Sequence, residues 1–309
     1  MAQILNWIHA LSVARPPALT AFEQTRLSWA KRIESYTDVP AAYKDFFDLF
    51  QAAGRAFPYA ILTPSYEGFI HRTTEKLICD VGDEIYVLER SGNTFEARGY
   101  PLAQIDYVEV RTMLLDSCIT ISGITKDGIL ATSSLRFNTV TDYLLTPIVK
   151  RIRLATTDAP GKALNSELEK FDQWVHVNYK FMSYAKRSLL GGEKVVHTLL
   201  QLEIRARVLT ILGKTYYRVI SPTHMCILTD RELIIISEEM RKSGDDRYGG
   251  IWRYILLHKI AALSVREKDD DLLVLAIQLP HGVQYEHLFQ PSMQQELDQF
   301  VVKYRELTL

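Results

Sequence analysis

Residues 224–237 read His-Met-Cys-Ile-Leu-Thr-Asp-Arg-Glu-Leu-Ile-Ile-Ile-Ser, which is two short apolar runs joined by a polar Thr-Asp-Arg turn. Residues 76–89 read Lys-Leu-Ile-Cys-Asp-Val-Gly-Asp-Glu-Ile-Tyr-Val-Leu-Glu and have the same form, with Glu84 in the place of Glu232. Apolar runs of this length, bounded by turn residues, are typical of paired β-strands. Each stretch therefore predicts an antiparallel strand pair, and their similarity suggests a repeat.

The similarity continues along the chain in the same order. Leu-Ala-Gln-Ile at 102–105 matches Leu-His-Lys-Ile at 257–260, and a closing helix is predicted after Phe137 and again after Phe289. A repeat of this length indicates a duplicated domain and not a solenoid unit. Duplication favours a binding module over an enzyme, and the sequence does not identify what is bound.

These patterns divide the chain into four segments. Residues 1–57 are an N-terminal helical region, 58–156 the first repeat, 157–190 a linker with a connecting helix, and 191–309 the second repeat. Each repeat contains about seven main strands, bounded by turn residues, and ends in one helix. The predicted fold class is therefore α+β.

The N-terminal region is predicted to hold two long helices and, over residues 4–14, a short helix that is not a signal peptide. Apolar residues recur at helical spacing over 18–36. The second helix begins near Pro40, ends at Gly54 and buries a row of aromatic side chains: Tyr43, Phe46, Phe47 and Phe50. We interpret the region as a helical cap packed on the first repeat. An adaptor or dimerisation surface is the alternative.

Both closing helices carry an apolar stripe. The first is predicted over 138–154, with a kink or a late start caused by Pro147. The second runs over 291–307, and its stripe has the width needed to cover an open barrel mouth. The stripe consists of Met293, Leu297, Phe300, Val301, Tyr304 and Leu307. Residues 203–208 alternate apolar and charged side chains, which predicts a strand with one buried face.

Residues 166–190 are predicted to form one connecting helix, which opens with a Ser-x-x-Glu capping box and ends at a Gly-Gly pair. The helix is unusually aromatic, and its apolar residues lie on more than one side. Such a helix is either sandwiched between two domains or exposed for a partner. We favour the sandwich. In the other case, Trp174, Tyr179 and Tyr184 would form the partner surface.

The composition is that of an ordinary globular protein. The 309 residues are 47% hydrophobic and 24% charged, and the formal net charge is -1. This charge provides no global attraction to nucleic acid or to an anionic membrane, and no nucleic-acid partner is expected. Three cysteines without a Cys-x-x-Cys motif indicate a reducing, cytoplasmic setting. No apolar stretch approaches the ~20 residues that span a bilayer. The oligomeric state is not indicated.

Two successive sets of antiparallel strands, each followed by one amphipathic helix, resemble the bacterial form of the pleckstrin-homology-like (PH-like) fold. The resemblance is carried by Glu-Lys-Val-Val at 193–196, the strand pair at 227–236 and Tyr-Ile-Leu-Leu-His-Lys-Ile at 254–260. The first repeat departs from the pattern, because Asp-Val-Gly-Asp at 80–83 replaces Leu-Thr-Asp-Arg. The resemblance implies two PH-like antiparallel β-barrel or sandwich domains, each closed by a C-terminal helix. It also implies binding of phosphoinositides, peptides or proteins.

The resemblance further implies that an anionic ligand would bind at the first two strands of a repeat and their joining loop. The matching positions of the second repeat are basic: Arg205, Arg207, Lys214 and Arg218. Guanidinium groups suit phosphate because their donors fork onto two oxygens. The first repeat offers only His71 and Arg72, beside Glu67. Each repeat has slightly more acidic than basic residues, so the alternative is that these arginines form surface ion pairs.

No catalytic, cofactor-binding or metal-binding residue is predicted. The histidines and cysteines lack metal-ligand spacing, and no nucleophile or phosphate-loop motif is present. The Asp triplet at 269–271 is interpreted as a solvated turn, and His281 and His287 as turn or surface residues. We therefore expect a non-enzymatic module that binds a protein or peptide. Peripheral binding to anionic lipid through the second repeat is the first alternative, and a hydrolase or transferase is the second.

Overall fold

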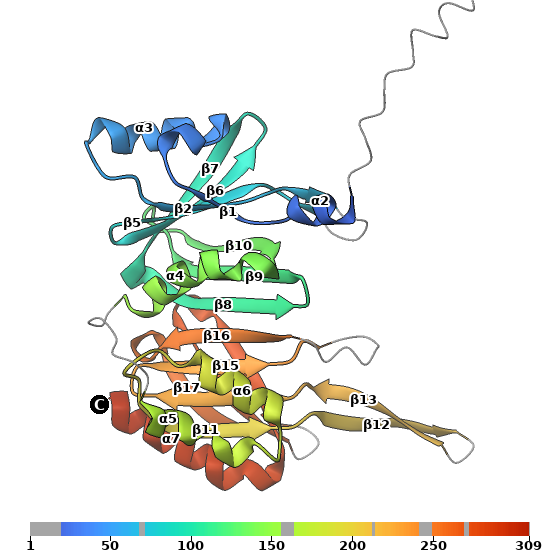
Figure 1. Ribbon diagram of the computed structural model, residues 1–309. Helices are drawn as coiled ribbons and strands as arrows, with labels where there is room; N and C mark the ends of the chain where they lie inside the picture. The colour runs from blue at the N-terminus through green and yellow to red at the C-terminus, as the bar shows by residue number, and fades with distance from the viewer. Residues whose placement is uncertain are drawn as a thin grey trace, which may run out of the picture.

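The computed structural model describes residues 20–67, 72–155, 164–211, 214–240, 249–268 and 272–308. Within these residues the protein is a mixed α+β fold whose sheets are built from antiparallel strand pairs (Figure 1). Three positions named above lie outside the described residues: the predicted helix over 4–14, His71, and the Asp triplet at 269–271.

The first half, residues 20–155, begins with α2 (Ala21–Arg26), β1 (Lys31–Ile33) and α3 (Lys44–Ala52). Its further strands are β2 (Tyr59–Thr63), β3 (Tyr66–Glu67), β4 (Arg72–Thr73), β5 (Lys76–Val81), β6 (Glu84–Ser91), β7 (Thr94–Pro101), β8 (Ile105–Met113), β9 (Asp116–Ile124) and β10 (Leu130–Asn138). The half ends in α4 (Asp142–Arg153), which has the late start that was one of the two expectations and which contains Pro147.

The second half, residues 164–308, begins with α5 (Asn165–Glu169) and α6 (Tyr179–Ser188). Its strands are β11 (Val195–Gln201), β12 (Ile204–Ile211), β13 (Lys214–Ser221), β14 (His224–Thr229), β15 (Glu232–Ser237), β16 (Gly250–Leu256), β17 (Ala262–Lys268), β18 (Leu272–Gln278) and β19 (Gln284–Phe289). The half ends in α7 (Gln294–Thr308).

The two halves have the same order of elements. In each half a helix, α3 or α6, precedes four main strands, a short 3-10 turn, three further strands and the closing helix. The 3-10 turns lie at Leu102–Gln104 and Leu257–Lys259, which are the matching Leu-x-x-Ile positions of the sequence. The similarity between the halves therefore includes the helix that precedes each sheet.

Each half buries a core between two layers of strands and its closing helix. In the first half the sheet β1-β2-β5-β6-β7 faces β8, β9 and β10, with α4 alongside. In the second half β11, β14, β15 and β16 face the sheet β17-β18-β19, and α7 completes the core. Most of the predicted stripe of α7 is buried: Leu297, Phe300, Val301 and Tyr304. No strand pair among the described residues closes either half into a barrel.

The helical cap predicted for the N-terminal region is α3. Its aromatic face packs on the outer side of the first-half sheet, where Tyr43, Phe46 and Phe47 are buried. In contrast, the helix predicted over 18–36 is wrong, because α2 ends at Arg26 and β1 follows it. Strand β1 pairs with β2, and this pairing buries Ile33. Long-range strand pairing outweighs the local helical spacing here.

The single helix predicted over 166–190 is also wrong. The segment is broken into α5, a 3-10 turn at Asp172–Trp174 and α6. Asn178 starts the new helix, because its backbone is extended and its side chain accepts a hydrogen bond from the backbone N–H of Phe181 at 3.2 Å. The predicted sandwich between two domains is wrong as well. Helix α6 packs on the outer face of β14 and β15, within the second half (Figure 1).

The two halves share one sheet, which the sequence did not predict. Its strand order is β10-β9-β8-β16-β15-β14-β11, so β8 of the first half pairs with β16 of the second (Figure 1). The ladder joins residues 108–112 to residues 250–254. The approach is close at Gly249, where a Cβ would lie 2.0 Å from the carbonyl oxygen of Thr112. Glycine is required at this position for that reason and because its φ is +96°.

A buried arginine fixes the end of α4 against the second half. The Nε of Arg153 donates to the two carboxylate oxygens of Glu232 at 3.0 and 3.2 Å, and its Nη2 donates to the carbonyl of Ser188 at 2.7 Å. The guanidinium also lies over the Tyr254 ring, 3.8 Å from the centroid. Burial, together with the neighbouring Glu232 carboxylate, raises the pKa of Glu193, which also lies in this cluster. The arginine therefore balances a buried carboxylate across the boundary between the halves.

Two histidine rings pack together in the second core. The centroids of His224 and His287 are 5.1 Å apart, and the Nε2 atoms of both are enclosed without a hydrogen-bond partner among the described residues. The Nδ1 of His224 lies 3.0 Å from the carbonyl of Pro222, which fits a neutral imidazole that donates there. Burial lowers the pKa of His224 to about 4 and that of His287 well below its usual range. The interpretation of His287 as a turn or surface residue was wrong.

This pair predicts a loss of stability in mild acid. Below about pH 6.5 the unfolded chain protonates these imidazoles, whereas the folded chain keeps them neutral, so the free energy of unfolding falls as the pH falls. Wild type should lose up to roughly 1.4 kcal/mol per pH unit more than His224→Phe, whose ring suits the contact with Phe289. Urea denaturation between about pH 7 and pH 5 measures the difference. The exposed His281→Asn serves as the control, and equal slopes for wild type and His224→Phe would contradict the prediction.

Candidate binding surfaces

A long hairpin projects from the second half. Strands β12 and β13 pair with each other from Ile204–Ser221 outward, directly beyond the last pair of β11 and β14, Gln201–His224. The four strands thus form one bent hairpin, and its outer part stands away from the body of the protein (Figure 1). In the described residues of the first half, strands β3 and β4 lie at the same place in the order.

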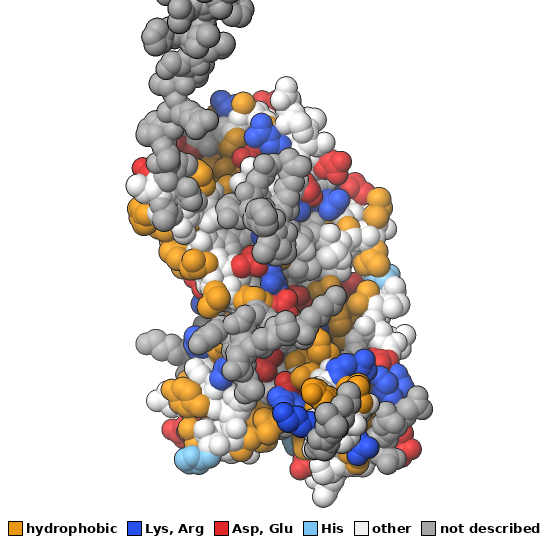
Figure 2. All heavy atoms as spheres, turned by 90° about the vertical axis from the view of Figure 1, so that its right-hand side faces the viewer, with side chains coloured by type: hydrophobic (Ala, Val, Ile, Leu, Met, Phe, Trp, Pro, Cys, Tyr) orange, Lys and Arg blue, Asp and Glu red, His pale blue; other side chains and the backbone are white. Residues whose placement is uncertain are grey.

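The outer hairpin exposes large apolar side chains. Their exposed fractions are 57% for Val208, 42% for Leu209, 52% for Tyr216 and 61% for Tyr217. Figure 2, in which the hairpin points toward the viewer, shows hydrophobic and basic side chains gathered at this place. The buried face predicted for residues 203–208 is wrong apart from Ile204, because β12 pairs only with β13 among the described strands and no second layer covers it there.

The basic residues predicted as an anionic ligand site all lie on this hairpin and are exposed. Arg205 and Arg207 share one face, as predicted, and the strand partner of Arg207 on that face is Tyr217. Arg218 pairs with Ala206 and so lies on the opposite face. The four cations therefore do not converge on one pocket. They surround the hairpin.

The ion-pair alternative holds for one of these residues. Arg205 is bonded to Glu203, whereas Arg207, Lys214 and Arg218 form no ion pair with any residue that the structure describes. Residues 203–218 hold four basic residues against this one acidic residue. The hairpin is thus locally basic on a chain whose net charge is -1.

The aromatic residues proposed as a partner surface are not exposed together. Trp174 is half-buried and packs in the cluster beneath α6. Tyr184 lies against Trp252, with ring centroids 4.7 Å apart. Only Tyr179 is largely exposed, at 67%. These side chains mainly attach α6 to the sheet.

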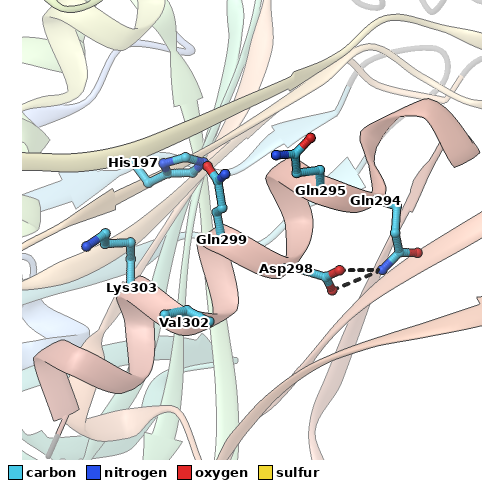
Figure 3. A pocket seen from close by; sticks show the side chains of 7 residues that line it. All are labelled: His197, Gln294, Gln295, Asp298, Gln299, Val302 and Lys303. Carbon is cyan, nitrogen blue, oxygen red and sulfur yellow. Dashed lines mark hydrogen bonds between the residues drawn. The ribbon is translucent and has the colours of Figure 1, made fainter.

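A groove that the sequence did not predict lies between β11 and α7, with a volume of about 500 Å³. His197 contributes from β11, and the other lining residues come from one side of α7 (Figure 3): Gln294, Gln295, Asp298, Gln299, Val302 and Lys303. The Gln294 amide donates to the Asp298 carboxylate at 2.9 and 3.0 Å. Burial lowers the pKa of His197. The polar residues at helical spacing were the signal that could have located this side of α7.

The groove runs beside a strand edge. In the first half the corresponding strand β2 is joined by β1, through the pairs Lys31–Leu62 to Ile33–Ala60. In the second half β11 pairs with β14 and with no other described strand. The start of this edge is covered, since the backbone N–H of Val195 donates to Glu167 at 2.6 Å and the Val195 carbonyl accepts from Lys170 at 2.8 Å. Beyond Val195 the second half leaves open an edge that the first half fills with its own chain.

The described residues contain no cluster of three or more His, Cys, Asp or Glu side chains that could hold a metal ion. The cysteines are free, and burial raises the pKa of Cys118 and that of Cys226, the latter to about 12. A raised pKa disfavours the thiolate that a nucleophile needs. No helix in the described part of the chain is both long and apolar enough to cross a membrane. No protein-family model matches the chain, and no curated protein matches its sequence.

Proposed function

We propose that the protein is a non-enzymatic binding module made of two PH-like units, over residues 58–156 and 191–309. The proposal is supported by the repeated order of four strands, three strands and a closing helix. It is also supported by the long hairpin of the second half, which joins the first two strands of its unit, the place where the resemblance puts a ligand.

The binding partner of the hairpin is an anionic membrane surface. The main support is that both faces of the hairpin are exposed and that each face carries both basic side chains and tyrosine. Arg207 shares a face with Tyr217, and Arg218 lies on the face opposite. A protein partner usually covers one face, whereas the lipid interface surrounds an inserted element. Tyrosine is favoured at the level of the headgroups, and basic side chains are attracted to anionic lipid.

The expected binding is weak and sensitive to salt. Each basic side chain near an anionic surface contributes about 1 kcal/mol. The three cations without an ion pair among the described residues, Arg207, Lys214 and Arg218, therefore contribute roughly 3 kcal/mol, and the exposed apolar side chains add to this. Screening within a Debye length of about 8 Å reduces the electrostatic part at physiological ionic strength. Reversible attachment follows, and not stable anchoring.

The test is vesicle co-sedimentation with phosphatidylcholine alone and with roughly 30 mol% phosphatidylserine added. Wild type should bind the anionic vesicles at low salt and be released by salt. The variant Arg207→Glu with Arg218→Glu should lose this binding at unchanged thermal stability, because both side chains are exposed. Lys31→Glu with Arg55→Glu changes the net charge equally, away from the hairpin, and should bind as wild type does.

A second arm measures the apolar contribution. Tyr216→Ser with Tyr217→Ser should reduce the binding that remains at physiological salt, because both rings are more than half exposed in the free protein. Absence of binding to anionic vesicles at low salt would refute the membrane proposal, and so would equal binding by wild type and the Arg207→Glu, Arg218→Glu variant.

Peptide binding is the second candidate function, and the pairing of β1 with β2 favours it. The strand β2, which corresponds to β11 in the first half, takes β1 as a further strand, and this supports the addition of a strand along β11 beyond Val195. A peptide there would gain main-chain hydrogen bonds from β11 and side-chain contacts from α7. Such a peptide would bind wild type and the hairpin charge-reversal variant equally, which separates this function from membrane binding.

A further inference from the structure

The two halves are joined head to tail. The joining strands β8 and β16 are not equivalent, because β8 follows the 3-10 turn of its half and β16 precedes the 3-10 turn of its own. The counterpart of β8 in the second half is β17, and the counterpart of β16 in the first half is β7. A junction between two different surfaces is heterologous, and it leaves one unused copy of each surface.

The unused copies are open strand edges. Among the described strands β7 pairs only with β6, and β17 pairs only with β18. The edge of β7 is covered at one end, where the carbonyl of Gly99 accepts a hydrogen bond from the backbone N–H of Lys126 at 2.9 Å. Elsewhere on these edges, residues 94–98 and 262–268 have no strand partner among the described residues, and such edges bind another strand readily.

Strand registers define how these two edges correspond to the internal junction. Glu84 pairs with Pro101 and its counterpart Glu232 pairs with Leu256, so residues 95–98 of β7 correspond to residues 250–253 of β16. Matching the two Leu-x-x-Ile turns in the same way places residues 264–267 of β17 on residues 109–112 of β8. The internal pairs of these segments then specify a register for the open edges.

We propose that β7 of one copy of this chain pairs antiparallel with β17 of another copy, in the register of the internal junction. This register sets Glu96 opposite Arg266, which are exposed and of opposite charge. Within one chain Glu96 lies 3.9 Å from Arg98 and Arg266 lies 2.7 Å from Glu286, so the contact between copies would join two existing ion pairs into a network. The remaining pairs are Phe95 with Glu267, Ala97 with Val265, and Arg98 with Ser264. No two like charges face each other, and opposite charges across strands stabilise pairing. The β8–β16 junction within one chain is also stabilised by opposite charges across the strands, the ion pair between Arg253 and Glu109.

Because the contact is heterologous, it does not stop at a dimer. Each added copy presents a new β7 edge at one end and a new β17 edge at the other, so copies form either a ring or an open chain. Because the pairing segment is short, each contact is expected to be weak, and association should increase with protein concentration. Each copy is joined to the next in the same orientation as the first half of a chain is joined to its second half.

Sedimentation velocity of the full chain, over about 1–200 µM, tests the proposal. The average mass of wild type should rise with concentration beyond that of a dimer. Glu96→Arg places like charges opposite each other and should weaken association about tenfold, as should Arg266→Glu. The surface variant Glu306→Arg, on α7, serves as the matched control and should associate as wild type does.

The decisive arm mixes the Glu96→Arg and Arg266→Glu variants. The two introduced side chains have opposite charges, and they face each other where β7 of the first variant meets β17 of the second. At the opposite contact, the native Arg266 of the first variant faces the native Glu96 of the second. The mixture should therefore recover wild-type association, whereas each variant alone does not.

Circular dichroism confirms that both variants fold. Three outcomes would each overturn the proposal: a wild type that stays monomeric, a closed dimer insensitive to Glu96→Arg, and a mixture that fails to recover association.

Discussion

Replacing Arg153 with alanine is expected to destabilise the protein by about 3–5 kcal/mol. The guanidinium is 6% exposed and Glu232 is 1% exposed, so the variant leaves a carboxylate buried without its counter-ion. The hydrogen bond to Ser188 and the contact with the Tyr254 ring are lost as well. Urea denaturation followed by circular dichroism measures the change.

Arg151 is the matched control, because it lies on the same helix with its side chain 38% exposed and bonded to Asp83. Arg151→Ala should cost less than about 1 kcal/mol, as surface ion pairs usually do. Combining Arg153→Met with Glu232→Gln removes both charges and should recover much of the loss. Equal effects of Arg151→Ala and Arg153→Ala would show that the buried cluster does not hold the halves together.

Leu297→Ala is expected to lower the free energy of unfolding by about 2–5 kcal/mol. Leu297 is 0% exposed in the second core, where α7 packs between the strand layers, and truncation leaves a cavity that the surrounding sheets cannot fill. Val302→Ala on the same helix is the control, because Val302 is 49% exposed and should change stability by less than about 0.5 kcal/mol. A loss for Leu297→Ala as small as that of Val302→Ala would mean that α7 does not complete the core.

Local sequence signals located most of the strands. The strand pair predicted within 224–237 is present as β14 and β15, since each strand is a continuous apolar run with turn residues at both ends. The closing helix α7 was found with its buried stripe, because helical spacing and core packing agree there. The break at Asn178 was missed, since a capping asparagine in an aromatic run is indistinguishable from a helix-interior residue without the turn around it.

Features that depend on distant pairing were not predictable in this way. Strand β1 is three residues long, and the edge of β2 specifies it, not its own pattern. The β8–β16 ladder and the Arg153–Glu232 contact join residues far apart in sequence, and neither strand nor arginine shows a local sign of its partner. In the hairpin, Arg205 and Arg207 share one face, as their spacing in the sequence predicted. The alternation at 203–208 suggested a buried face. That prediction failed because alternation alone does not show whether a second layer of the protein covers the apolar side.

The shared sheet has a consequence for synthesis of the chain. Ribosomes complete the first half before residues 250–254 exist, so β8 has no partner along one edge while the nascent chain grows. During the same interval Arg153 lacks Glu232, the carboxylate that balances it. Unpaired strand edges in partly made proteins are prone to aggregate. The first half therefore reaches its final state only after the second half has been made.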